Sequence, residues 1–156
     1  MKLVNVETDE KINGRINRLT SAQVKNLKGS KKFQFDWSLE EANEVYAIKR
    51  VGNGELLGLL SLTDVAEELR IHINLIESAI QHQGKNKEID GIPGCLIGFA
   101  CEMSFKRGYD GFVSLTPKTR LVDYYHKKFG FLQTGKNMAV FLEISQSIIK
   151  KYLKDG

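Results

Sequence analysis

The chain has 156 residues, 42% of them hydrophobic, which is typical of one globular domain with a single core. Lysine and arginine outnumber aspartate and glutamate by 23 to 19, and the excess is spread along the chain, which favours an anionic ligand over a nucleic acid. No zinc-finger spacing, basic run interleaved with aromatics or ribonucleoprotein motif is present, so no nucleic-acid partner is expected.

Cysteine spacing and hydropathy indicate the compartment in which the protein is expected. Cys95 and Cys101 lie six residues apart on a predicted helix, a spacing that favours two small buried groups over a disulfide or a metal pair. The first residues turn polar early, and no apolar run approaches the ~20 residues that cross a bilayer. We expect a soluble cytoplasmic protein with no metal and no membrane partner.

The first third of the chain predicts short elements followed by a hairpin. "KLVNV" alternates like a strand, and "TSAQVKNLK" is helix-like and ends at Gly29. "KKFQFDW", residues 31–37, alternates with period two and predicts another strand. Residues 44–65 contain two apolar runs around the turn "GNG", which predicts a β-hairpin.

The rest of the chain alternates strands and helices. A strand begins at Leu69, a helix with an apolar stripe runs up to Gly108, and the strand "GFVSLTP" follows. A second helix ends at Gly130, and the strands "FLQTG" and "MAVFLEI" lead into the terminal helix "SQSIIKKYLK". This order predicts one domain over residues 1–156, a three-layer α/β fold in which residues 71–78 and 111–116 are neighbouring parallel strands.

The loop "IDGIPG" opens the first long helix and is a candidate phosphate cradle. Backbone N–H groups at a helix N-terminus lack intrahelical partners, and the peptide dipoles favour negative charge there. Gly91 and Gly94 would let a ligand approach the main chain, with Lys85 and Lys87 adding charge. The alternative is that both glycines only make a turn and Pro93 only starts the helix.

The succession of a long strand, this loop, a helix ending in "KRGY", a strand and a helix ending in "KKFGF" resembles the GNAT superfamily of acyl-CoA-dependent N-acetyltransferases. The resemblance covers about residues 44–144. Its most specific parts are "DGIPGCLIGFACEMSFKRGYDGFVSL" and "YYHKKFGF". It implies a GNAT-like fold with a mixed central sheet of about six to seven strands, helices on both faces, and acetyl-CoA as acyl donor.

The loop departs from the GNAT pattern, which has Gln or Arg, two residues, Gly, one residue, then Gly or Ala. Aligned on Gly91, the chain has Glu88 at the first position and Pro93 at the last. Glu88 puts a like charge near a phosphate and Pro93 removes one donor; alternatively, Lys87 takes the basic position. The N–H groups expected to remain as phosphate donors are those of Gly91, Ile92, Gly94 and Cys95.

The resemblance also implies an active site on the strand that precedes the loop. The pantetheine arm would lie along this strand, with oxyanion-stabilising N–H groups near Leu75, Ile76 and Glu77. The Glu77 carboxylate is the candidate general base; the alternative is a solvated strand-end carboxylate. His72, in the same strand, is expected to be a hydrogen-bonded surface or core group. Asn74 is either a group that hydrogen-bonds the substrate or an ordinary polar strand residue.

A tyrosine four residues before the terminal glycine of the later helix is the common GNAT proton donor. Counting back from Gly130, this position is His126, with Tyr125 just before it. Tyr125 is our candidate, because a phenol suits protonation of a thiolate, whereas Tyr124 is expected to pack and His126 to face solvent.

The start of the later helix supplies one more candidate. Thr119 matches a position where the family often has an asparagine that binds the pantetheine arm, and capping the helix is the alternative. Lys118 and Arg120 would meet the nucleotide phosphates or face water.

The function expected from the resemblance is transfer of an acetyl group from acetyl-CoA to a primary amine of a small molecule or protein, by direct attack in a ternary complex. The alternative is a non-catalytic acyl-CoA-binding or regulatory domain, because Glu88, Pro93 and the displaced tyrosine depart from the pattern. A homodimer through the last strands is also compatible with the resemblance.

Overall fold

A computed structural model of the protein describes residues 1–117 and 121–154. Seven strands form a mixed sheet in the order β3-β4-β5-β6-β8-β10-β9, in which β6 and β8 are parallel and all other neighbours are antiparallel. Its strands are β3 (Gly14–Arg18), β4 (Glu44–Arg50), β5 (Leu56–Val65), β6 (Arg70–Ser78), β8 (Val113–Leu115), β9 (Leu132–Thr134) and β10 (Asn137–Val140).

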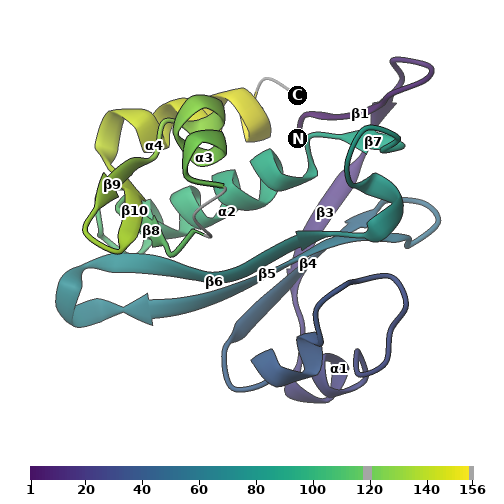
Figure 1. The fold of residues 1–156 in the computed structure, drawn as a ribbon, viewed down its shortest axis with the longest axis horizontal. Coiled ribbons are helices and arrows are strands. Elements are labelled where there is room, and N and C mark those ends of the chain that lie inside the picture. The colour runs from purple at the N-terminus through teal and green to yellow at the C-terminus, as the bar shows by residue number, and fades with distance from the viewer. Residues whose placement is uncertain (118–120, 155–156) are drawn as a thin grey trace.

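Helices cover both faces of this sheet (Figure 1). One face carries α2 (Ile92–Lys106), α3 (Val122–Phe129) and α4 (Leu142–Ile149), which continues as a π-helical turn, Lys150–Lys154. The other face carries the short helix α1 (Ser21–Lys25) and the loop that follows it. In residues 1–117 and 121–154, no helix is both long enough and apolar enough to cross a membrane.

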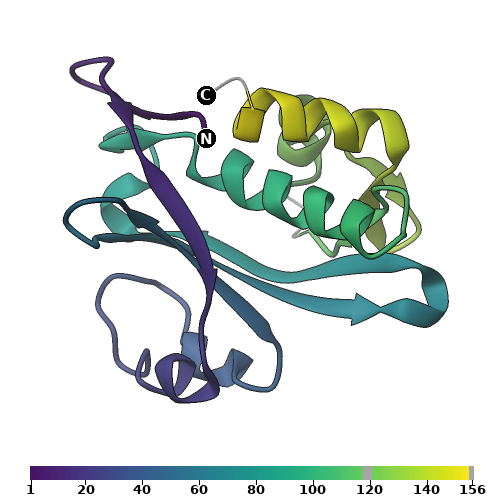
Figure 2. The ribbon, with the colours of Figure 1, turned by 180° about the vertical axis from the view of Figure 1, so that it is seen from behind.

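A second, small sheet ties the N-terminus to the loop before α2. Its order is β2 (Lys11–Ile12), β1 (Leu3–Asn5) and β7 (Ile89–Asp90). The N-terminus lies beside the last helical turn, Lys150–Lys154 (Figures 1 and 2), and Lys2 N donates to Tyr152 O at 2.7 Å. The N-terminus of α2 is therefore held by both ends of the chain.

Two apolar clusters fill the space on either side of the sheet. The larger lies between the sheet, α2 and the C-terminal helix, and includes Leu60, Ile71 and Leu96, each fully buried. The smaller lies against the other face, where Val24, Phe33 and Trp37 cover β4, β5 and the end of β6. Each cluster removes apolar side chains from water, which is the main force holding the layers together.

Several predicted elements are confirmed. The hairpin over residues 44–65 is β4 and β5, and β6 and β8 are the predicted parallel neighbours. Gly108 and Gly130 follow helices with φ of +84° and +83°, the left-handed conformation expected of a glycine that ends a helix. Cys95 and Cys101 are buried free thiols. The predicted mixed α/β fold class is confirmed.

The strand predicted for residues 31–37 is wrong. This segment is a loop that enters a 3₁₀ turn, Trp37–Glu40. Phe33 and Trp37 are buried as the alternation implied, but the N–H groups of Gln34 and Phe35 donate to the carboxylate of Glu77 instead of to a neighbouring strand.

Two further elements differ from the sequence prediction. The predicted strand "MAVFLEI" is too long, because β10 ends at Val140 and α4 begins at Leu142. Strand β3 was not predicted, since "GRINR" carries a single apolar side chain.

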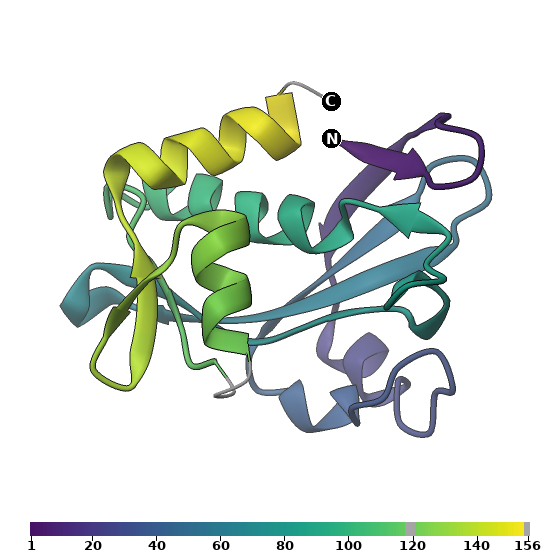
Figure 3. The ribbon, with the colours of Figure 1, turned by 45° about the horizontal axis from the view of Figure 1, so that its top comes forward.

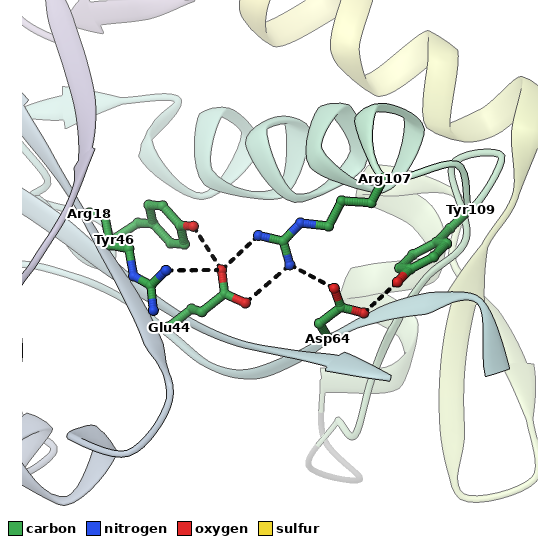
Figure 4. A network of polar contacts seen from close by, with 6 residues as sticks. All are labelled: Arg18, Glu44, Tyr46, Asp64, Arg107 and Tyr109. Atoms are coloured by element: carbon green, nitrogen blue, oxygen red, sulfur yellow. Dashed lines mark hydrogen bonds and ion pairs between the residues drawn. The ribbon is translucent and has the colours of Figure 1, made fainter. Parts of the chain in front are cut away.

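A network of charged and phenolic side chains fixes the C-terminal end of α2 to the sheet (Figure 4). Arg107 donates to both oxygens of Glu44 at 3.0 and 2.8 Å and to Asp64 at 2.9 Å. Tyr46 and Tyr109 donate to these same carboxylates. The Arg107 guanidinium and, to a lesser extent, the Tyr46 hydroxyl hold the pKa of Glu44 below its usual 4.5, although burial of the carboxyl group acts in the opposite direction.

An Arg107→Met variant should therefore lose about 2–3 kcal/mol of its free energy of unfolding near pH 7, because two partly buried carboxylates lose a charged donor. A depressed folded-state pKa adds stability above the unfolded value of 4.5 and loses it as pH falls below that value. The difference from wild type should shrink below pH 4.5 in urea unfolding followed by circular dichroism. Lys106→Met, which breaks only an exposed pair with Glu102, is the control; an equal loss there would contradict the prediction.

Candidate active site

The candidate site begins where β6 and β8 separate. They pair only over residues 71–73 and Val113–Leu115, and β6 then runs on to Ser78 paired with β5 alone. The register with β5 shifts beside Asn74, because Leu62 faces Ile73 while Ser61 faces Leu75. Such a bulge bends a strand and re-aims its groups. The edge of β6 that faces away from β5 is therefore open beyond Ile73.

Backbone alternation identifies the N–H groups that face this open edge. Ala79 N donates to Leu57 O on β5 at 2.8 Å. Because successive N–H groups of a strand point to opposite sides, those of Glu77 and Leu75 also face β5, and that of Ile76 faces the opening. Of the three positions expected to polarise a carbonyl group, Ile76 alone has a suitably directed N–H.

A cleft of about 270 Å³ occupies this opening, and we call it the splay cleft. Gln34 and Phe35 line it, together with residues of β6, the end of β8, the segment that follows β8, and α3. The described residues that line it are all uncharged: Gln34, Phe35, Ile73, Asn74, Leu75, Ile76, Leu115, Thr116, Pro117, Leu121 and Tyr125.

The three candidate side chains of α3 point to different places. Tyr125 is half-buried and lines the splay cleft, and burial raises the pKa of its hydroxyl. Tyr124 does not lie there; it is 41% exposed and faces the N-terminus of α2. His126 is exposed, and its Nδ1 lies 3.0 Å from Phe131 O. Tyr125 is therefore the one of the three that lines the splay cleft.

A second cavity, of about 240 Å³, lies at the N-terminus of α2 and is also lined by residues of α3, and we call it the lysine pocket. Figure 3 shows α3 in front of α2. Four lysines line it from separate parts of the chain: Lys2, Lys87, Lys128 and Lys151. Its acidic lining residue, Asp90, pairs with Lys87 at 2.9 Å, and this bond is the first cause of the lowered pKa of Asp90. Such a pocket at a helix N-terminus suits an anion.

A third cavity, of about 440 Å³, joins the other two, and we call it the middle cavity. It shares Gln34, Phe35 and Ile76 with the splay cleft. It shares Lys87 and Tyr124, among other residues, with the lysine pocket. The three cavities therefore follow one another from the positive end of α2 to the open edge of β6.

The loop "IDGIPG" presents fewer free donors than the sequence suggested. Cys95 N donates to Gly91 O at 3.0 Å inside the helix, and Gly91 N donates to the Asp90 carboxylate. Ile92 and Gly94 keep N–H groups in the first turn, where no intrahelical acceptor exists. Any role of these groups in binding phosphate stays a prediction.

Packing accounts for both glycines of this loop. A Cβ on Gly91, whose φ is +100°, would lie 2.0 Å from Lys2 O on the N-terminal strand. A Cβ on Gly94 would lie 2.2 Å from the ring of Tyr152. The close approach that glycine permits here is therefore to the two ends of the chain.

The sequence matches no protein-family model and no curated protein. The fold, however, matches solved structures. Nourseothricin acetyltransferase superposes with a TM-score of 0.61 at 14% identity, over 83% of this chain and 98% of that chain. A GNAT family acetyltransferase from Brucella melitensis in complex with acetyl-CoA gives 0.55 at 14% identity, over 83% and 88%. An IAA acetyltransferase from Bacillus cereus gives 0.57 at 18% identity, over 79% of both chains.

This chain has the GNAT fold. The superpositions establish the fold. Because the sequence identities are low, activity and substrate have to be argued from the site itself. The resemblance seen in the sequence is thereby confirmed at the level of fold.

Within this GNAT fold, Glu77 is not a solvated strand-end carboxylate. It is 6% exposed and accepts from Gln34 N, Phe35 N, Trp37 Nε1 and Gln83 Nε2. This geometry does not test its predicted role as general base. It does show that the carboxylate holds residues 34–37 against the end of β6.

Two polar residues of β6 lie on the sheet face away from α2. His72 Nδ1 lies 3.0 Å from an Arg70 nitrogen and 2.8 Å from Ser114 Oγ. Burial, followed by the charge of Arg70, lowers the pKa of His72. Asn74 bonds to Thr63 across the hairpin and also lines the splay cleft. Asn74 is thus the one of the pair that reaches the cleft.

Other predicted residues lie apart from the site or outside the described residues. Thr119, Lys118 and Arg120 belong to the latter group. Lys85 and Glu88 line a separate cavity beside the β1–β2 turn, so the Glu88 carboxylate is not part of the lysine pocket. Among the described residues, no group of histidine, cysteine and acidic side chains is placed to hold a metal ion.

The sequence reasoning missed Lys2, Lys128 and Lys151, and it missed the Gln34–Phe35 wall. The lysines come from the N-terminal segment, α3 and the last helical turn, so no local motif links them. Lys128 carried the one usable signal, since it lies in "YYHKKFGF", the segment that supported the resemblance.

Proposed function

We propose that this protein is an N-acetyltransferase that transfers the acetyl group of acetyl-CoA to a primary amine by direct attack in a ternary complex. The observation that carries the proposal is the succession of lysine pocket, middle cavity and splay cleft. It suits an extended ligand with phosphates at one end and a thioester at the other. The named structural neighbours, among them a complex with acetyl-CoA, support the same assignment.

The phosphates of the cofactor would lie in the lysine pocket. Lys2, Lys87, Lys128 and Lys151 would supply charge, and the free N–H groups of Ile92 and Gly94 would donate along the helix axis. Pro93 has no N–H to add, so this site depends more on lysine side chains than on the backbone of the loop.

The acetyl group would lie at the open edge of β6. The Ile76 N–H is directed to hold the thioester oxygen, which gains negative charge as the amine attacks. The new C–N bond forms, the C–S bond breaks, the amine loses a proton and the departing thiolate gains one. Tyr125 lines the splay cleft and is the proposed donor to the thiolate, because its raised pKa keeps it protonated at neutral pH.

Calorimetric titration with acetyl-CoA, with free CoA and ATP as controls, tests the binding half of the proposal. We expect a micromolar dissociation constant for acetyl-CoA and much weaker binding of ATP. Release of CoA thiol in the presence of primary amines tests the catalytic half. Acetyl-CoA binding without turnover on any amine would favour a non-catalytic acyl-CoA-binding domain, and equal binding of ATP would contradict the cofactor assignment.

The positive charge of the lysine pocket should contribute to the affinity for acetyl-CoA. Lys128→Ala and Lys151→Ala should each weaken acetyl-CoA binding about tenfold, or about 1.4 kcal/mol, because each removes a cation from an anion site. Lys49→Ala, which removes an exposed lysine of β4, is the matched control. The wild-type affinity should also fall as salt rises. Unchanged affinity in both lysine variants would place the phosphates elsewhere.

A further inference from the structure

The carboxylate of Glu77 has all of its acceptor positions in use. Gln34 N at 2.7 Å and Gln83 Nε2 at 3.3 Å donate to Oε2, while Phe35 N at 3.3 Å and Trp37 Nε1 at 2.9 Å donate to Oε1. A carboxylate offers about four lone-pair sites, and here four donors meet them. A base that takes a proton from an ammonium group needs one site free in the direction of the substrate.

The donors to Glu77 come mainly from one segment, residues 34–37. This segment lies outside the strands, and Trp37 at its end is 1% exposed. Gln34 and Phe35 line both the splay cleft and the middle cavity. The position of that wall is therefore set by the carboxylate of Glu77.

We propose that Glu77 is a positioning residue, whose carboxylate fixes residues 34–37 as the wall against which the acceptor amine is held beside the acetyl group. This inference rests on the proposed function, since it assigns the acceptor side of the same site. The proton of the amine then leaves to water or to a group other than Glu77. The wall decides how the amine is oriented and which acceptors fit.

The chemistry of a Glu77→Gln variant makes the proposal testable. Each carboxylate oxygen meets two donors, so a glutamine amide sets its NH₂ against two N–H groups in either orientation. The segment should therefore loosen, although the side chain keeps its size. Trp37→Phe is the second variant, because it removes the Nε1 donor to Glu77 and keeps an aromatic ring in the smaller apolar cluster.

Two measurements report how firmly residues 34–37 are held, and neither requires an acceptor amine. Lys31 and Lys32 precede the segment and are exposed, so trypsin cleavage there follows its local opening. Trp37 is the single tryptophan of the chain, so acrylamide quenching reports its burial directly. We expect cleavage to speed up about tenfold in Glu77→Gln and about threefold in Trp37→Phe, in line with the loss of two bonds and of one. Quenching should rise in Glu77→Gln, and Glu7→Gln, an exposed carboxylate, is the control.

Two amine probes separate positioning from base catalysis. Ethylamine must lose a proton before it attacks at pH 7, whereas hydroxylamine is already neutral. A positioning role predicts that Glu77→Gln lowers kcat/KM for both probes by the same factor, about tenfold and mostly through KM, with the shape of the pH profile unchanged. A base role predicts a large loss of kcat with ethylamine and little change with hydroxylamine.

The outcomes distinguish failure of this inference from failure of the proposed function. Unchanged trypsin cleavage and quenching in Glu77→Gln, or hydroxylamine activity that survives while ethylamine activity is lost, would overturn the positioning role. If wild type neither binds acetyl-CoA nor acetylates either probe, the proposed function fails. Because the inference depends on that function, it would then lose its catalytic meaning, whatever trypsin shows about the wall.

Discussion

A Gly91→Val variant will lose about 3–5 kcal/mol of its free energy of unfolding, because it combines backbone strain with a collision. Gly91 has φ of +100°, a conformation that a β-branched residue strongly disfavours. Its Cβ would lie 2.0 Å from Lys2 O, a backbone atom next to Leu3, the first residue of β1 in the small sheet β2-β1-β7. Neither group can move without breaking the pairing of β1 with β7, so urea unfolding should show the loss directly.

Gly84→Val is the matched control for this prediction. Gly84 lies in the loop on the other side of β7, with φ of +71°, yet nothing lies within 4 Å of an added Cβ. The Gly84→Val variant should lose only the part of the free energy of unfolding that backbone strain accounts for, about 1–2 kcal/mol. Equal losses in the two variants would mean that β1 does not press on the loop before α2.

The need for glycine at position 91 was visible in the sequence, but its reason was not. A glycine before a predicted helix indicates an unusual backbone or a close neighbour, and both are present. The neighbour turned out to be Lys2, at the far end of the chain, where the sequence suggested a ligand. A local motif can indicate that there is no room for a side chain at a position, but it cannot identify the neighbouring group that takes up the room.

Elements defined by local periodicity were predicted well. The hairpin of β4 and β5 and the parallel pair of β6 and β8 follow from apolar alternation, turn residues and the handedness of crossovers. Residues 31–37 show the limit of this reasoning, since Phe33 and Trp37 are buried at the expected spacing without forming a strand. The side chain of Glu77 satisfies the backbone there, and such a long-range partner leaves no trace in the alternation.

The candidate site was predictable only in part, for the same physical reason. Tyr125 and Ile76 lie on single elements whose faces the sequence defines. The lysine pocket gathers residues from four separate segments, and only the folded chain brings Lys2 and Lys151 together. The mild positive charge of the whole chain indicated an anionic ligand but could not locate it.

A Tyr125→Phe variant should lower kcat for amine acetylation about 10²–10³-fold, the range expected for loss of a general acid. Tyr125 lines the splay cleft, and burial raises the pKa of its hydroxyl above the usual 10.0, so the hydroxyl remains a proton donor throughout the neutral range. Phenylalanine keeps the ring contacts with Phe129 and Phe131, so the fold and the dissociation constant of acetyl-CoA should change little. Steady-state kinetics and calorimetry measure the two effects separately.

Tyr124→Phe provides the comparison that decides which tyrosine is used. Tyr124 faces the lysine pocket and the middle cavity, and it does not line the splay cleft, so loss of its hydroxyl should leave kcat within about threefold of wild type. A large fall in kcat for Tyr124→Phe with little change for Tyr125→Phe would reverse the assignment. Because leaving-group protonation matters most for a basic thiolate, a cofactor analogue with a more acidic thiol should restore much of the rate lost in Tyr125→Phe, which a merely misfolded variant could not regain.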